Sequence, residues 1–100
     1  MLVIRDIMYC KPGKVRPMVK KLIALGKLSE GKAVGSMRVM TDVSAERFWT
    51  VVTEFEVPNL DAFMNMDGMS KEEQQQMEEI MKDYHELVDH GRREIYTLEQ

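Results

Sequence analysis

The alternation of apolar and polar positions along the chain predicts four β-strands. Each of the four segments is rich in β-branched and aromatic side chains, which favour the extended backbone of a sheet. Turn-forming residues separate them, and the stretch DVSAE at 42–46 suits a hairpin between the second and third strands. The predicted strands are residues 2–10, 33–41, 47–57 and 92–99.

A helical repeat follows the first predicted strand. Pro12 and Gly13 mark the exit from that strand, and apolar residues then recur at steps of three and four. Basic residues, Lys20 and Lys21 among them, fall on the other side, so the segment is expected to be an amphipathic helix. Its predicted apolar stripe consists of Val15, Met18, Val19, Leu22, Ile23 and either Leu25 or Leu28.

A second amphipathic helix is predicted from Ser70 to Gly91. Ser70 and Glu73 have the spacing of a capping box, in which each side chain accepts a hydrogen bond from the other residue's backbone amide. Gly91 is expected to end the helix as a left-handed cap. The predicted stripe is Met77, Ile80, Met81, Tyr84, Leu87 and Val88. A short helical turn containing Leu60, Phe63 and Met64 is expected before this helix.

The predicted order of elements is β-α-β-β-α-β, the ferredoxin-like arrangement, in a single α+β domain over residues 1–100. Both helices should cover one face of a four-stranded antiparallel sheet. On the third strand the set containing Trp49 and Val51 should meet the helices, whereas the set containing Phe48, Val52 and Glu54 should face away. That second face is half apolar, so we expect another sheet to cover it.

Composition narrows the classes of function. One hundred residues with a net charge of −3 make one domain without a basic stripe, so nucleic acid is not an expected partner. The apolar run at the start of the chain is too short for a leader or a membrane span, and the basic helix has no aromatic anchor for a membrane surface. Cys10, the only cysteine, fits a reducing compartment, and we expect a cytoplasmic protein.

Two histidines near the end of the chain, His85 and His90, raise the question of a metal site. In the zinc motif H-E-x-x-H the histidines are four positions apart and share a helix face. Here they are five positions apart, which on a regular helix separates them by about 140° at about 100° per residue. We therefore expect no metal.

Three stretches resemble the dimeric α+β-barrel superfamily, which includes antibiotic-biosynthesis-monooxygenase-like and NIPSNAP-like domains. They are YCKPGKV, VVTEFEVPNLDAFMNM and DHGRREIYTLEQ. The resemblance implies a homodimer in which two sheets pack face to face. It does not decide whether the chain is an enzyme, because members of the superfamily range from cofactor-independent monooxygenases to proteins without known activity. No cofactor is expected, since Phe63 and Met64 occupy the place where haem-degrading relatives carry a tryptophan and the first strand lacks their asparagine.

A cleft between helices and sheet is the first candidate site. Trp49, Phe63, Tyr84 and His85 are predicted to line it and to bind a small apolar or aromatic molecule, with cofactor-independent monooxygenase-like chemistry as a further expectation. Ten methionines would fill gaps in the core or give such a pocket a plastic wall. Two alternatives stay open: His85 is an ordinary surface residue, and the protein is a non-enzymatic dimeric interaction or assembly module.

Arg5, Arg38 and Glu54 form the second candidate set, because charges inside strands are costly unless they are paired or hydrated. If the hairpin places Thr41 opposite Arg47, Glu54 lies about 13 Å beyond the residue opposite Arg38, at about 3.3 Å per residue. Arg38 and Glu54 are then not cross-strand partners. Arg5 and Arg38 are instead each expected to pair with a glutamate of the other subunit, or one of them to bind an anionic ligand inside the barrel.

Overall fold

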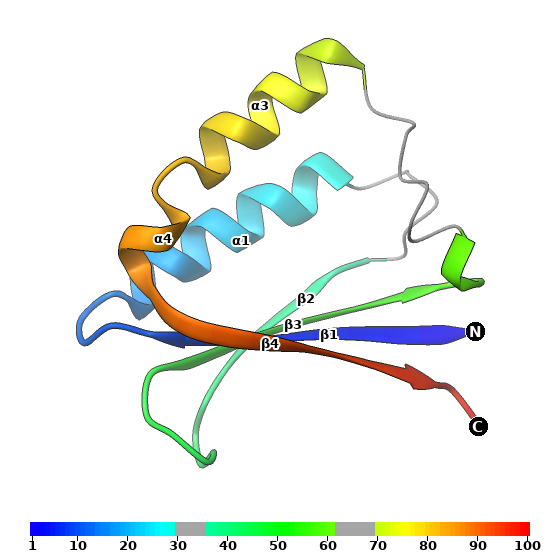
Figure 1. Ribbon diagram of the computed structural model, residues 1–100, viewed down its shortest axis with the longest axis horizontal. Coiled ribbons are helices and arrows are strands. Elements are labelled where there is room, and N and C mark those ends of the chain that lie inside the picture. The colour runs from blue at the N-terminus through cyan, green and yellow to red at the C-terminus, as the bar shows by residue number, and fades with distance from the viewer. Residues whose placement is uncertain (30–35, 62–69) are drawn as a thin grey trace.

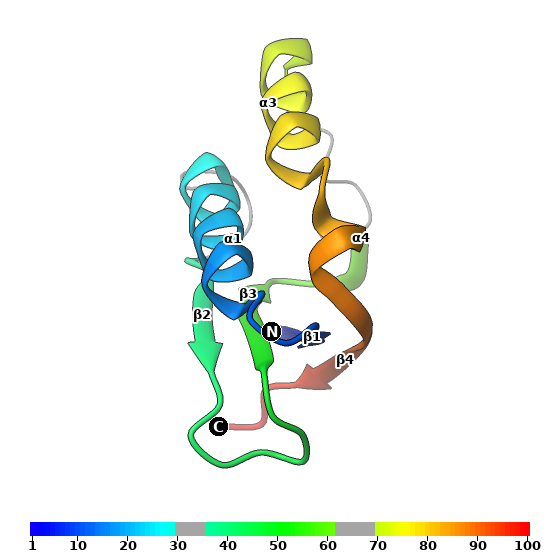
Figure 2. The same ribbon diagram turned by 90° about the vertical axis from the view of Figure 1, so that its left-hand side faces the viewer.

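The computed structural model describes residues 1–29, 36–61 and 70–100. These residues form a four-stranded antiparallel sheet with the order β2-β3-β1-β4, and the predicted ferredoxin-like class is confirmed. Both long helices lie on one side of the sheet, as a separate layer (Figures 1 and 2). In chain order the elements are β1 (Leu2–Cys10), α1 (Val15–Ser29), β2 (Arg38–Thr41), β3 (Thr50–Val57), α3 (Lys71–Met81), α4 (Tyr84–Leu87) and β4 (Val88–Thr97).

The helix-facing side of the sheet carries the core in two clusters. The larger one joins Met8 and Val51 of the sheet to Met18 and Leu22 of α1 and to Leu87. The smaller one contains Ile4 and Val57, both fully buried. Alternation along β1 therefore places its even-numbered residues toward the helices.

Lys21 of α1 fixes the far end of α3. Its ammonium group donates to the carbonyl oxygen of Ile80 and forms an ion pair with Asp83 just beyond the helix. The Lys21 side chain is only 10% exposed, so its predicted place on the solvent side of α1 is wrong. Unpaired carbonyls at a helix C-terminus attract a cation, and this attraction outweighs the helical pattern of charges.

The α3 helix starts where the sequence predicted it. Ser70 Oγ accepts from the Glu73 amide at 3.1 Å, and Glu73 Oε1 accepts from the Ser70 amide at 3.1 Å, so the predicted capping box is confirmed. The helix itself packs loosely, because none of its residues is buried and its apolar stripe is only half-buried. No helix among the described residues is both long and apolar enough to cross a membrane.

The predicted end of this helix is wrong. The α-helix ends at Met81, a turn and the short α4 follow, and the chain is already extended at Val88. Gly91 lies within β4 opposite Met8, where a Cβ atom would come within 2.6 Å of the Ile7 carbonyl oxygen. Glycine is needed there for close contact between strands and not for a left-handed cap. His90 also lies on β4, so the helical angle between the histidines does not apply.

The hairpin between β2 and β3 is longer than expected. Thr41 pairs with Val51, which leaves residues 42–49 as a loop that bends away from the helices (Figure 1). Among the described residues the second strand covers only Arg38–Thr41, and residues 33–35 of the predicted strand lie outside the described part. Trp49 lies in the loop with φ of 61° and is 46% exposed, so it is not part of the buried core that it was predicted to join beneath the helices.

Candidate functional site

A row of four alternating charges crosses the face of the sheet that points away from the helices, called here the open face. Arg38 lies opposite Glu54, Glu54 opposite Arg5, and Arg5 opposite Glu94. The sequence-based register, which separated Arg38 from Glu54, is therefore wrong. The longer loop between β2 and β3 shifts the pairing and brings the two residues together.

Glu54 is the centre of this row. Its carboxylate accepts from Arg5 Nε at 2.9 Å and also pairs with Arg38. The residue is buried, and the hydrogen bond from Arg5 holds the pKa of the Glu54 carboxyl below its usual value, although burial acts in the opposite direction. A buried carboxylate with a guanidinium on each side stays ionised without a further partner.

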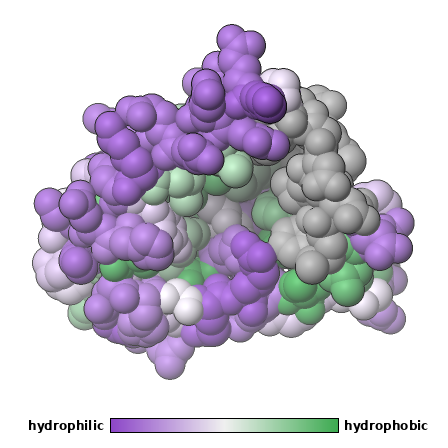
Figure 3. Space-filling model, turned by 45° about the horizontal axis from the view of Figure 1, so that its top comes forward, coloured by the Kyte–Doolittle hydropathy of each residue, from purple (hydrophilic) through white to green (hydrophobic). Residues whose placement is uncertain are grey.

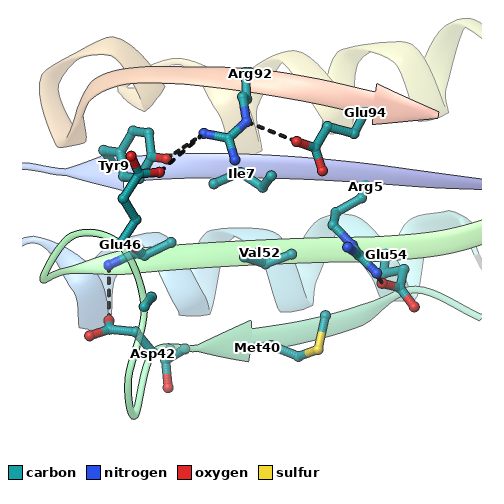
Figure 4. A pocket seen from close by; sticks show the side chains of 13 residues that line it. Arg5, Ile7, Tyr9, Met40, Asp42, Glu46, Val52, Glu54, Arg92 and Glu94 are labelled. Carbon is teal, nitrogen blue, oxygen red and sulfur yellow. Dashed lines mark hydrogen bonds and ion pairs between the residues drawn. The ribbon is translucent and has the colours of Figure 1, made fainter. Parts of the chain in front are cut away.

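Next to the charged row the open face is hollowed. The hollow has a volume of about 360 Å³, and Ile7, Val52 and Met40 provide its apolar part while charged side chains surround them (Figure 4). At one end Arg92 Nη1 donates to the Tyr9 hydroxyl at 2.5 Å. The guanidinium carbon of Arg47 lies 4.7 Å from the centre of the Tyr9 ring. An apolar centre with a polar rim is the usual composition of a surface that binds a partner.

A second polar group lies on the other face, beneath the helices. Arg93 of β4 donates to Asp6 of β1 through Nε at 2.6 Å and Nη2 at 3.1 Å. Thr53 of β3 is opposite Asp6 and is buried. Tyr84 of α4 is half-buried nearby: burial raises the pKa of its hydroxyl, and the negative charge of Asp6 raises it further.

Of the predicted cleft residues that the structure describes, Tyr84 and His85 are neighbours, whereas Trp49 lines a hollow that neither of them lines. Tyr84 packs against the larger core cluster, whereas His85 is exposed with its ring 5.2 Å from that of Tyr84. Trp49 lines a different hollow, of about 330 Å³, beside Phe48 and the start of α1. Phe63 lies outside the described residues. Within residues 1–29, 36–61 and 70–100 no three His, Cys, Asp or Glu side chains gather in a way that could hold a metal ion.

Sequence reasoning missed the pair of Asp6 and Arg93. A signal was present, because Asp6 has the same strand parity as the core residues Ile4 and Met8. Its position therefore puts a charge on the buried side of the sheet, where charges are rare unless they are paired. The sequence prediction named Arg5, one residue earlier, as the charged residue of this strand.

Comparison with known proteins agrees with this architecture. No family profile matches the chain, and a search of curated proteins finds no significant match. Solved structures do match. A Deinococcus radiodurans protein, provisionally named an antibiotic biosynthesis monooxygenase, superposes with a TM-score of 0.74 at 10% identity, over 100% of this chain and 94% of that one.

Two NIPSNAP proteins are similarly close in structure. An uncharacterized NIPSNAP domain protein from Burkholderia xenovorans gives a TM-score of 0.71 at 14% identity, over 98% of this chain and 94% of that chain. A NIPSNAP family protein from Agrobacterium tumefaciens gives a TM-score of 0.73 at 17% identity, over 96% of this chain and 90% of that chain. The chain therefore has the fold of the antibiotic biosynthesis monooxygenase-like and NIPSNAP-like domains, as the sequence resemblance predicted.

Proposed function

We propose that the protein works as a homodimer in which the open faces of two sheets pack against each other. The observation that carries this proposal is the composition of the open face. Its centre is the apolar hollow over Ile7 and Val52, and Met40 and Tyr96 remain 38% and 46% exposed. Apolar surface of this kind is stabilised by burial, at roughly 25 cal/mol per Å².

The charges on the open face are compatible with such burial. Glu54 already has both arginines as partners, so a second sheet can cover the row without leaving a carboxylate unpaired. The order of the row also suits a symmetric dimer. A two-fold axis parallel to the strands reverses the row of one subunit relative to the other, which places Glu54 of one subunit opposite Arg5 of the second.

Substitution of Val52 by lysine tests the interface. Val52 is half-buried on the open face, so Val52→Lys would force a charge between the two sheets and should produce monomers. Ile23→Lys on α1 is the matched control, because Ile23 is 44% exposed on a helix and away from the open face. Sedimentation equilibrium should give monomers for the first variant only. Dimers of equal strength in both variants would contradict the open face as the interface.

As the second half of the proposal, each subunit binds a small, largely apolar or aromatic molecule between the helices and the sheet. The half-buried Tyr84 and the hollow between α3 and the sheet support this (Figure 3). Cofactor-independent monooxygenation is the proposed reaction class, since the Deinococcus radiodurans neighbour of the same fold carries a monooxygenase name. The competing proposal is a non-enzymatic interaction or assembly module.

Binding and oxygen uptake separate these two proposals. Small phenols and hydroquinones are added to the protein in air, and binding is followed by NMR while oxygen is followed with an electrode. Protein-dependent oxygen uptake supports the enzyme. Binding without uptake supports a carrier of small molecules, and a dimer with neither property supports the assembly module.

A further inference from the structure

We propose that the loop of residues 42–49 is a docking arm for a second copy of the chain. Its exposed apolar side chains, Val43 and Phe48, pack on the partner subunit at the end of the open face. The inference rests on the homodimer proposed above. It adds a second part to the interface, which the sheet faces alone do not supply.

The exposure of the loop is the first argument. Val43 is 102% exposed and Phe48 is 80% exposed, more than any other large apolar side chain among the described residues. Trp49 follows directly and is 46% exposed, with its ring 6.2 Å from that of Phe48. Single apolar residues are normal at a protein surface, whereas contiguous ones mark a site of interaction.

Polar contacts at its base hold the loop in place, and not burial of these side chains. The Asp42 carboxylate accepts from the Thr50 amide at 2.9 Å, and the Thr50 hydroxyl donates to the Arg47 carbonyl oxygen at 2.7 Å. The Trp49 carbonyl oxygen accepts from the Cys10 amide at 2.9 Å, although the φ of 61° at Trp49 is strained for a bulky residue. A loop fixed in this way loses little entropy when a partner covers it.

The direction of the loop selects a second copy as the partner. Figures 1 and 2 show that the loop leaves the end of the sheet on the side away from the helices. Ala45 and Glu46 of the loop line the hollow of the open face. The loop is therefore continuous with the face that the proposed dimer covers, and a sheet packed on that face runs alongside it.

The open face also needs further apolar contact. The row of alternating charges crosses it, and Arg92 borders the hollow. The central parts of protein interfaces are depleted of charged residues. Apolar contact at the end of the face therefore has to contribute to the affinity, and Val43 and Phe48 supply it.

The two-fold axis decides what the arm meets. An axis parallel to the strands keeps equivalent strand ends together and reverses the strand order. The loop between β2 and β3 then lies across from the ends of β4 and β1 of the partner subunit. Tyr9 and His90 lie at these ends with their rings 4.8 Å apart, and the Arg47 guanidinium covers the Tyr9 ring. Phe48 would meet the partner's His90 and the partner's Arg47, flat groups that pack well on an aromatic ring.

Dimer affinity is the first test, measured by sedimentation of the full chain over a dilution series. Phe48→Ala should raise the dissociation constant of the dimer by at least about tenfold, which is about 1.4 kcal/mol. Val43→Ser should raise it as well. Both variants should keep the circular dichroism spectrum of the wild type, because both side chains are exposed in their own chain. Ile23→Ala on α1, 44% exposed and away from the loop, is the matched control with unchanged affinity.

A photo-crosslinker shows where the arm docks. The photoreactive amino acid p-benzoylphenylalanine is placed at position 48, and the dimer is irradiated. The product should have twice the mass of one chain, because the crosslink joins two subunits. The peptide attached in the second chain should contain His90 or Arg47.

An unchanged dissociation constant in both loop variants would overturn the inference, since the loop would then serve a different protein or none. A crosslink that stays within one chain, or that reaches another part of the second chain, would overturn it too. Either result leaves the dimer of the sheet faces standing, whereas a wild-type chain that is monomeric at every concentration would overturn both proposals. If Phe48→Ala fails to fold, Val43→Ser decides, because Val43 is fully exposed.

Discussion

Arg38 on β2 and Glu54 on β3 lie directly opposite each other and form an ion pair across the edge of the sheet. The pair depends on the hairpin, because the loop of residues 42–49 sets the register that brings the two side chains together. Glu54 also binds Arg5 of the central strand, so one carboxylate connects three strands.

Acid should weaken the fold through Glu54. Its pKa is held below the ordinary value of 4.5 in the folded protein, chiefly by the hydrogen bond from Arg5, so the folded state binds the proton less readily than the unfolded state. This contribution is present in full above about pH 4.5 and is lost as the pH falls through the folded pKa. Urea unfolding at pH 7 and pH 3 should show the loss.

Glu54→Gln should remove the same contribution at pH 7. We expect the free energy of unfolding to fall by about 1–2 kcal/mol. The expected loss is small because Arg38 is well exposed, and solvent weakens its ion pair with Glu54. The variant should also have a smaller difference in stability between pH 7 and pH 3 than the wild type. An unchanged pH dependence would mean that other carboxylates cause the acid sensitivity.

Gly91→Ala should destabilise the protein. The added Cβ would lie 2.6 Å from the Ile7 carbonyl oxygen, and neither backbone can move without disturbing the pairing of β1 and β4. A loss of about 2 kcal/mol or more is expected in thermal or urea unfolding, the range of overpacked sites. Gly26→Ala is the control: its Cβ would lie 3.2 Å from the flexible end of the Met37 side chain and at an ordinary 3.6 Å from the Met37 Cβ, and alanine favours a helix by about 1 kcal/mol. Equal stability of the two variants would refute this account of Gly91.

Lys21→Met should loosen α3 without unfolding the sheet. The substitution keeps an apolar side chain of similar length but removes the charge that holds the Ile80 carbonyl and Asp83. Hydrogen exchange of the α3 amides should become faster by about tenfold, which corresponds to about 1.4 kcal/mol. Lys20→Met, at an exposed neighbouring position, should leave exchange unchanged. Exchange that rises equally in α3 and the sheet would indicate global destabilisation instead.

The sequence predicted the fold where a regular repeat and a local signal agreed. The first strand was predicted with its observed bounds, and the capping box at Ser70 places the start of α3 correctly. The end of that helix could not be found in the same way. Val88 continues the helical repeat but is extended beside Cys10 of β1, and such long-range strand pairing leaves no mark on a local pattern.

The candidate site was predicted less well, for two physical reasons. A shift in the hairpin register by a few residues changes every cross-strand neighbour, which is why Arg38 and Glu54 were assigned to separate places. A ligand site between layers also depends on the distance between them, and periodicity does not report that distance. The neighbourhood of Asp6 and Arg93 depends on the pairing of β1 with β4, which the local pattern of the sequence does not report either.

The mass of the wild-type protein in solution tests the central claim, that the open face is covered by a second copy of the chain. Sedimentation velocity over a dilution series through the micromolar range is the measurement. A dimer of two 11.7 kDa subunits at micromolar concentration is the result we predict. A stable monomer of 11.7 kDa at every concentration would contradict the claim.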